Sequence, residues 1–207
     1  MTAETASMRD HWWWRPGWSV GRRFYTWHLT FAGQTDVHRL ARQYRTALAP
    51  CGDALTPIPD RWLHLTMQGI GFTDEVDERD VRAVVAAARG HLARVPAFDV
   101  RIGSAVLDPE AVLLPVRPEG PVRAVRDSIR AAIGDVLPEV PEKQAGFAPH
   151  VSVAYSAGDG PSEPISRSLA GFDPTPAQAH ISSAELIVLH RDHRMYEWET
   201  YAEVPLA

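Results

Sequence analysis

Two segments of the chain alternate strictly between apolar and polar side chains, and this period of two restricts both to β-strands. In FYTWHLTF, residues 24–31, the polar side chains are Thr26, His28 and Thr30, and those between them are aromatic or aliphatic. RWLHLTMQG, residues 61–69, repeats the alternation. Successive side chains of a strand point to opposite faces of its sheet. Each segment therefore predicts a half-buried strand with one apolar and one polar face.

Between and after these strands lie segments of helical period. Residues 35–48 place apolar side chains at helical spacing, namely Val37, Leu40, Ala41, Tyr44 and Leu48. The same reasoning predicts helices over 81–92 and 121–137, and a short one over 163–171. Further strands are expected over 98–108, 111–118 and 148–156, with a terminal hairpin over 184–206 that turns near Asp192. Strands and helices mix without a regular βαβ order, which predicts the α+β class with antiparallel sheets.

Composition limits the functions that the chain can have. With 207 residues, 45% of them hydrophobic, it can bury a core as one large domain or two small lobes. The net charge of −5 argues against a protein that binds long nucleic-acid duplexes. No apolar run reaches the length of a membrane span, and the N-terminus lacks the pattern of a signal peptide. The single cysteine, Cys51, forms no internal disulfide, which fits a cytoplasmic protein.

A triplet of histidine, an apolar residue and a hydroxyl occurs three times, at 28–30, 64–66 and 150–152. Residues i and i+2 of a strand share a face and lie about 6.6 Å apart. Such a pair places a group that can exchange a proton near neutral pH beside a neutral hydrogen-bond donor. Two pairs facing each other would supply a general base, a general acid and two phosphate-binding hydroxyls without a metal. One copy alone is an ordinary polar pair on a solvated sheet face.

The context of the second and third copies separates them from the first. RWLHLTMQGIGF, residues 61–72, and FAPHVSVAY, residues 147–155, resemble the paired signatures of the two-histidine (2H) phosphoesterase superfamily. More closely, they resemble its bacterial 2′-5′ RNA ligase, or RNA 2′,3′-cyclic phosphodiesterase, branch. The matching positions are His64, Leu65, Thr66, Phe147, Pro149, His150 and Ser152. In the first signature, Gln68 to Gly71 stand where the family prefers Phe-Leu-Gly.

The resemblance implies a fold and a site. The fold is bilobed, with two antiparallel sheets lining a central cleft and helices outside, here as one domain over 23–207 preceded by an aromatic-rich arm over 1–22. His64 and His150 would be the acid and base, in an order left open, and Thr66 and Ser152 would hold phosphate. The implied protein is a phosphodiesterase that needs no cofactor or metal and cleaves, or in reverse forms, bonds at ribose 2′ hydroxyls.

The substrate remains open between an RNA end and a small nucleotide cyclic phosphate. RNA-processing relatives often have a basic residue just after the second signature, where this chain has Ala154 and Tyr155. We infer no membrane association and no obligate protein partner. Two alternatives stay open: a non-catalytic nucleotide- or RNA-binding module that uses the same cleft, and, more remotely, a metal-dependent hydrolase built on His190 and His193.

Four more residues share the polar faces of the first two strands and are candidates to line the cleft: His28, Thr26, Trp62 and Gln68. For His28 we favour a solvated or structural histidine over a contact with substrate. Tyr155 should point away from His150 if its strand is regular.

Two further clusters, the tryptophans of the N-terminal arm and a pair of histidines near the C-terminus, are candidate functional sites. The tryptophans of the arm, Trp12, Trp13, Trp14 and Trp18, could stack on bases with Arg15, but we favour their packing across the body of the protein. His190 and His193 form His-x-x-His at the predicted hairpin turn. No further ligand is evident in the sequence, so we expect turn histidines rather than a metal site.

Overall fold

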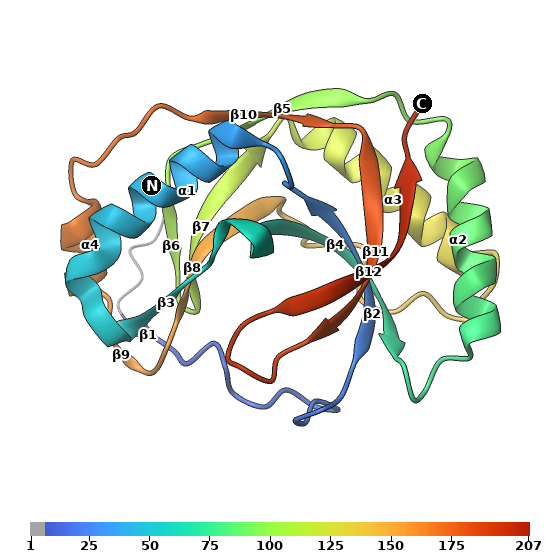
Figure 1. The fold of residues 1–207 in the computed structure, drawn as a ribbon, viewed down its shortest axis with the longest axis horizontal. Helices are drawn as coiled ribbons and strands as arrows, with labels where there is room; N and C mark the ends of the chain where they lie inside the picture. Colours follow the sequence, from blue (N-terminus) through green and yellow to red (C-terminus); the bar gives the residue numbers. More distant parts are fainter. Residues whose placement is uncertain (1–6) are drawn as a thin grey trace.

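The computed structural model describes residues 7–207, and its helices lie at the two ends of a pair of sheets (Figure 1). Its α-helices are α1 (Thr35–Leu48), α2 (Glu78–Leu92), α3 (Glu119–Gly134) and α4 (Glu163–Leu169), with 3-10 turns η1 (Ala49–Ala54) and η2 (Asp60–Trp62). Its strands are β1 (Ser7–Met8), β2 (Phe24–Thr30), β3 (Leu55–Pro57), β4 (His64–Phe72), β5 (Phe98–Ile102), β6 (Val106–Asp108), β7 (Ala111–Arg117), β8 (His150–Ser156), β9 (Gly160–Pro161), β10 (Ala177–Ile181), β11 (Ser183–His190) and β12 (Glu197–Pro205).

The strands form two main antiparallel sheets, which confirms the predicted α+β class. One has the order β12-β11-β2-β4. The other has the order β10-β5-β7-β8-β3, with β6 also paired to β7. Strands β4 and β8 of the two sheets contact each other, so the two strands that carry the second and third triplets meet where the sheets meet.

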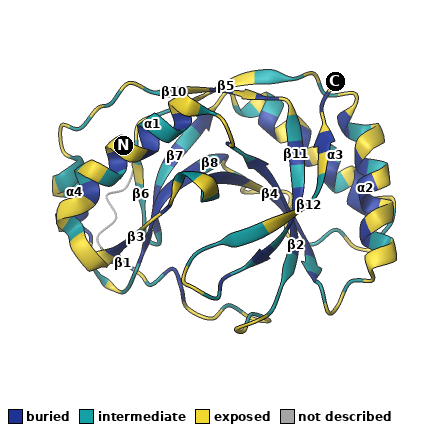
Figure 2. Cartoon of the chain, in the orientation of Figure 1, coloured by how far each residue is buried: buried dark blue, intermediate teal, exposed yellow. Residues whose placement is uncertain are grey.

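The helices cover the outer faces of the sheets. Helix α1 packs on β8 and β10 with α4 beside it, and α2 and α3 pack together against β12 and β4. In Figure 2 the helices bury one side and expose the other, while β2, β4 and β8 between them are largely buried. The five apolar positions predicted for 35–48 are the buried face of α1. None of the helices in the described part of the chain is long and apolar enough to cross a membrane.

The strand expected over 98–108 is two strands, β5 and β6, which pair with opposite ends of β7. The interruption falls opposite Pro115 of β7, which has no N–H to continue the ladder. Its carbonyl instead accepts a hydrogen bond from the N–H of Gly103, at 3.1 Å. A proline in the partner strand thus divides residues 98–108 into two strands, although their own sequence predicts one continuous strand.

Strand β2 also differs from the expectation of one solvated face. Its central residues are buried on both faces of the sheet. On the polar face, the ring of His28 lies against His64, at 4.3 Å between centroids, and against Trp198 of β12, at 5.6 Å. Side chains from β4 and β12 of the same sheet therefore cover the face that the sequence pattern leaves to solvent.

Candidate active site

His64 and His150 occupy equivalent positions, each as the first residue of its strand. The Nδ1 atom of His64 lies 2.8 Å from the carbonyl oxygen of Trp62, and that of His150 lies 2.8 Å from the carbonyl oxygen of Ala148. A carbonyl can only accept, so Nδ1 carries the proton in both rings. In the neutral state each imidazole is left with an unprotonated Nε2, which can take a proton or, once charged, return it.

The two triplets line one pocket. A cavity of about 320 Å³ is bordered by His64 and Thr66 from β4 and by His150 and Ser152 from β8. The other lining residues are His11, Arg15, Asp108, Glu110, Ala111, Leu113, Tyr155 and Tyr196. Two imidazoles and two hydroxyls therefore converge on one space that is open to solvent and large enough for a small ligand.

Burial and charge set the protonation of His64. Its pKa is lowered from 6.5 to about 4, chiefly because burial disfavours the charged ring. The hydrogen bond to the Trp62 carbonyl opposes this shift and the charge of His150 adds to it. His64 is therefore neutral at neutral pH. His150 is less buried, which leaves its ring within reach of water.

Behind His64 lies His28, the first copy of the triplet. The two rings are parallel, with 3° between their planes. His28 is 1% exposed, and its pKa lies well below 6.5 because of burial and the charge of His64. Its Nδ1 has no hydrogen-bond partner among residues 7–207. Its Nε2 lies 3.5 Å from the Thr66 hydroxyl. His28 borders the two β4 site residues from inside the protein and does not itself line the cavity.

A bulge in β4 directs Gln68 away from the cavity. Trp27 of β2 is opposite Gln68 and His28 is opposite Thr66, so Met67 is an extra residue in the ladder. A bulge of this kind changes the face on which the following side chains lie. Gln68 is fully buried, and its side-chain oxygen accepts a hydrogen bond of 2.6 Å from Arg130 of α3.

The carbonyl freed at this bulge is bound by an arginine. Arg126 of α3, 5% exposed, donates 2.8 Å to the oxygen of Met67. The same guanidinium donates to the carbonyls of Lys143 and Gln144. It ties the bulge to the loop that leads to β8.

The remaining two candidates also lie outside the cavity. Thr26 is buried, and its hydroxyl donates to the carbonyl of Gln68 at 3.3 Å. Trp62 packs on Trp198 with ring centroids 4.7 Å apart and lines a separate cavity. Trp62 contributes to the site through its backbone carbonyl, which holds His64.

A second bulge, in β8, brings Tyr155 into the cavity. Leu113 of β7 pairs with Ser152 and Val112 pairs with Ala154, which leaves Val153 as an extra residue. Tyr155 therefore shares the face of Ser152, where a regular strand would turn it away. It is 3% exposed, and a hydrogen bond links it to Ser152. Nothing in the sequence around Tyr155 signals the bulge.

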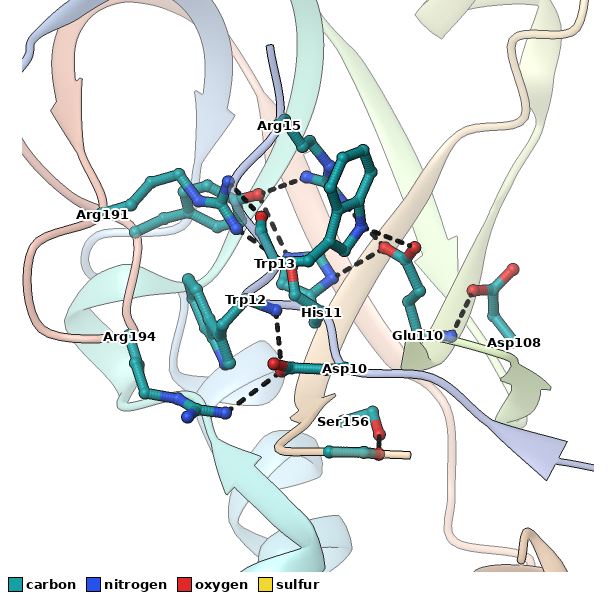
Figure 3. A network of polar contacts seen from close by, with 12 residues as sticks. Asp10, His11, Trp12, Trp13, Arg15, Asp108, Glu110, Ser156, Arg191 and Arg194 are labelled. Atoms are coloured by element: carbon teal, nitrogen blue, oxygen red, sulfur yellow. Dashed lines mark hydrogen bonds and ion pairs between the residues drawn. The ribbon is translucent and has the colours of Figure 1, made fainter. Parts of the chain in front are cut away.

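The N-terminal arm lines one side of the cavity with His11 and Arg15. Figure 3 shows both residues beside Glu110. Strand β1 pairs with β9, and the N–H of His11 then donates to the carbonyl of Ser156 at the end of β8. Arg191, which follows β11, donates to the carbonyl of His11. His11 stacks on Tyr155, with centroids 4.0 Å apart, and its Nε2 lies 3.1 Å from the Tyr196 hydroxyl. Burial, and then the charges of Arg15 and Arg191, lower the pKa of His11 to about 3. His11 is therefore a neutral part of the wall.

Arg15 is the single lysine or arginine among the described residues that line the cavity. Its guanidinium donates to Glu110 at 2.6 Å and to the Tyr196 hydroxyl at 2.9 Å. Of the arm tryptophans, Trp12 is buried, whereas Trp13 and Trp14 are about half exposed. The sequence draws attention to Arg15 only as a neighbour of these tryptophans, and no pattern indicates Glu110 or Tyr196.

Comparison with known proteins assigns the family. Residues 33–193 match the model of the 2′-5′ RNA ligase superfamily. The chain belongs to this superfamily. The resemblance seen in the two signatures is thereby confirmed. The matched region contains both β4 and β8, whereas the arm with His11 and Arg15 precedes it. No curated protein sequence matches the chain significantly.

Solved structures with similar folds have distant sequences. TT0787 of Thermus thermophilus superposes with a TM-score of 0.67 at 19% identity, over 89% of this chain and 97% of that one. LigT of E. coli complexed with 3′-AMP gives a TM-score of 0.63 at 15% identity, over 90% and 99%. At these identities the likeness shows a shared fold, which confirms the predicted fold type.

Proposed function

We propose that the chain is a metal-independent phosphodiesterase that hydrolyses ribose 2′,3′-cyclic phosphates or 2′-5′ phosphodiester bonds, or forms the latter in reverse. One observation carries the proposal. Two histidines, each with Nδ1 held by the carbonyl two residues earlier, line a single cavity together with Thr66 and Ser152. This set contains the proton acceptor, the proton donor and the neutral phosphate ligands that the reaction needs.

The difference in environment between the two histidines supports one distribution of the roles. His64, neutral because burial lowers its pKa to about 4, is the base in hydrolysis. Its Nε2 takes a proton from water as the water oxygen bonds to phosphorus. His150 enters as the imidazolium, and its Nε2–H protonates the ribose oxygen as the bond from phosphorus to that oxygen breaks. The product is a phosphate monoester, and the two histidines end with their protonation exchanged.

The hydroxyls and the arginine bind the phosphate. Thr66 and Ser152 donate to its non-bridging oxygens, and Tyr155 supports Ser152. Arg15 supplies the one fixed positive charge among the described cavity residues. Its present partner, Glu110, is a carboxylate that the phosphate oxygens would replace. A charge-assisted bond of this kind is typically shorter and stronger than one between neutral groups.

The fold and the size of the cavity support a nucleotide or an RNA end as substrate. E. coli LigT, which shares the fold, has been crystallised with ATP, 3′-AMP, NADP+ and phosphate. A cavity of about 320 Å³ with histidines, hydroxyls and one arginine suits the phosphate and ribose of a nucleotide or of an RNA end. Base identity is not read by any of these groups, so we propose a substrate defined by its ribose phosphate.

The test is a substrate panel with matched variants. Nucleoside 2′,3′-cyclic phosphates, 2′-5′ dinucleotides and RNA with a cyclic phosphate end are incubated with the chain, with and without chelator. Turnover should survive the chelator. His64→Ala and His150→Ala should each lower kcat by about 10²–10⁴-fold while circular dichroism shows an intact fold.

His180→Ala is the matched control, because His180 is an exposed histidine of β10 that pairs with Asp99 of β5 and does not line the cavity. It should keep full activity. Nucleotide binding without turnover of any panel member would instead identify a binding module. Full activity of either cavity variant would refute the acid–base pair.

A further inference from the structure

Three metal-ligating side chains meet at the β11–β12 hairpin, outside the cavity described above. They are His190 at the end of β11, His193 in the turn and Glu197 at the start of β12. Their ligand atoms all lie within 4.8 Å of one another. The Oε2 atom of Glu197 is 2.5 Å from Nδ1 of His193 and 4.0 Å from Nδ1 of His190. Hairpin pairing, which the local sequence does not reveal, brings Glu197 to the His-x-x-His motif.

We propose that His190, His193 and Glu197 form a site for a divalent transition metal of the zinc class. Two imidazole nitrogens and one carboxylate oxygen are a common donor set for Zn²⁺ with a fourth position left open. Tetrahedral ligands about 2.0 Å from zinc lie about 3.3 Å from each other. The distances from Glu197 Oε2 to His193 Nδ1, 2.5 Å, and to His190 Nδ1, 4.0 Å, lie on either side of that value.

The cluster can close on a metal without repacking the protein. The side chain of His193 is 74% exposed, so its ring can turn about its own torsions. Those of His190 and Glu197 are about 20% exposed and are held by the paired strands. Rotation of His193 sets its own distance to the metal, whereas His190 and Glu197, 4.0 Å apart, must approach each other by about 0.7 Å to reach tetrahedral spacing.

The surrounding charges favour a cation. The cluster lines a cavity of about 480 Å³ whose charged residues are Arg23, Glu197 and Glu199. Arg23 is already paired with Asp192, at 2.9 Å. The Oδ2 atom of Asp192 also lies 3.5 Å from His190 Nδ1 and adds negative charge beside the site. The carboxylates of Glu197, Glu199 and Asp192 therefore outnumber the single guanidinium of Arg23, which leaves the site with net negative charge when the imidazoles are neutral.

The proposed metal site is separate from the His64–His150 cavity. Trp198 lies between them, 5.3 Å from the His64 ring and 4.7 Å from the Trp62 ring. The metal therefore has no ligand in common with the acid–base pair. Its open position faces the second cavity, which has room for water or for an anionic group.

The experiment measures metal binding directly. Untagged full-length chain, stripped with chelator, is dialysed against Zn²⁺ and titrated with Co²⁺. We expect one metal per chain and the visible absorption of tetrahedral Co²⁺. His190→Ala, His193→Ala and Glu197→Gln should each weaken binding by about 100-fold, comparable to the largest effects seen when a supporting group of a site is lost. Binding should also weaken below about pH 6, because protons compete for the imidazoles.

His180→Ala is again the matched control, since His180 lies 2.8 Å from one carboxylate and belongs to no three-residue cluster found in the described residues. It should bind metal like the parent chain. Absence of stoichiometric binding, or binding unchanged in His190→Ala and His193→Ala with the fold intact, would mean that the cluster holds ion pairs only. Either result leaves the proposed phosphodiesterase activity untouched, because turnover with chelator is measured independently.

Discussion

The imidazole of His28 lies parallel to that of His64, with ring centroids 4.3 Å apart and 3° between the ring planes. The first copy of the repeated triplet thus backs the second copy and holds no place of its own in the cavity. The contact joins a buried, neutral ring to a ring that borders the cavity. Packing of this kind restricts the orientation of His64.

Replacing His28 should separate packing from chemistry. His28→Ala removes the ring behind His64 and should lower the free energy of unfolding by about 2–4 kcal/mol. Movement of His64 by about 1 Å should lower kcat by about 10²-fold. His28→Phe keeps a ring in place and should restore most of both quantities, measured by urea unfolding and by turnover of a cyclic nucleotide. A stable His28→Phe variant as inactive as His28→Ala would mean that a nitrogen of His28 takes part in the reaction.

Stability should fall in mild acid because buried histidines must be protonated on unfolding. The pKa of His64 is lowered to about 4 and that of His11 to about 3, whereas in the unfolded chain both lie near 6.5. Between those values the unfolded state binds more protons, so the free energy of unfolding is greatest above pH 6.5 and decreases as the pH falls toward 4.

For His64 alone this loss amounts to about 3 kcal/mol by about pH 4. Urea unfolding at several pH values measures the slope of the unfolding free energy against pH. This slope counts the protons taken up on unfolding, and His64→Asn should lower that number by about one. The exposed-site variant His180→Ala serves as reference. An unchanged slope in His64→Asn would show that the pKa of His64 is not depressed in the folded protein.

The pH dependence of kcat/KM should report the pKa of His64, the proposed base. Protonation of His64 removes the proton acceptor, so kcat/KM should fall on the acid side with a midpoint near about pH 4. Short assays after a pH jump, with circular dichroism at each pH, keep unfolding out of the measurement. A midpoint near about 6.5 would assign the acid limb to another group.

Arg15 should control substrate affinity. Arg15→Ala should raise KM by about 10–100-fold, the equivalent of about 1.5–3 kcal/mol for a hydrogen bond to a charged group. Arg194→Ala is the matched control: Arg194 also holds the arm, through Asp10 at 3.1 Å, but does not line the cavity. The double variant Arg15→Ala/Glu110→Gln tests whether the effect comes from an exposed carboxylate. Full recovery of KM in the double variant would show that Arg15 merely neutralises Glu110.

Arg126 should hold the bulge that follows Thr66. Arg126→Met preserves the aliphatic part of the side chain but leaves the Met67 carbonyl without its donor. Loss of a buried, charge-assisted hydrogen-bond set should cost about 2–4 kcal/mol of unfolding free energy. Arg123→Met, on the same helix and exposed, should cost under about 0.5 kcal/mol. Equal stabilities of the two variants would contradict a structural role of the buried guanidinium.

Local sequence patterns were sufficient to find the pairs within each motif. His64 with Thr66, and His150 with Ser152, are i and i+2 residues of strands, and the period of a strand places each pair on one face. The helical spacing of residues 35–48 likewise defined the buried face of α1. The motif context then indicated the superfamily, which the match over residues 33–193 confirms.

Other residues depend on contacts between distant segments. A bulge at Met67 turns Gln68 into the core, and a bulge at Val153 turns Tyr155 into the cavity, although strict alternation predicts the reverse for both. A bulge is set by how two strands pair, so neither strand's own sequence signals it.

By itself, the sequence determined the strand and helix periods, the superfamily and the two histidine–hydroxyl pairs, because these depend on residues close together in the chain. Only the tertiary structure decided that both pairs line one cavity, that His28 backs His64, that the arm contributes Arg15, and that Glu197 joins His190 and His193. The reason is physical: each of these relationships is made by packing and strand pairing between segments far apart in sequence, and local periodicity carries no information about which segments will meet.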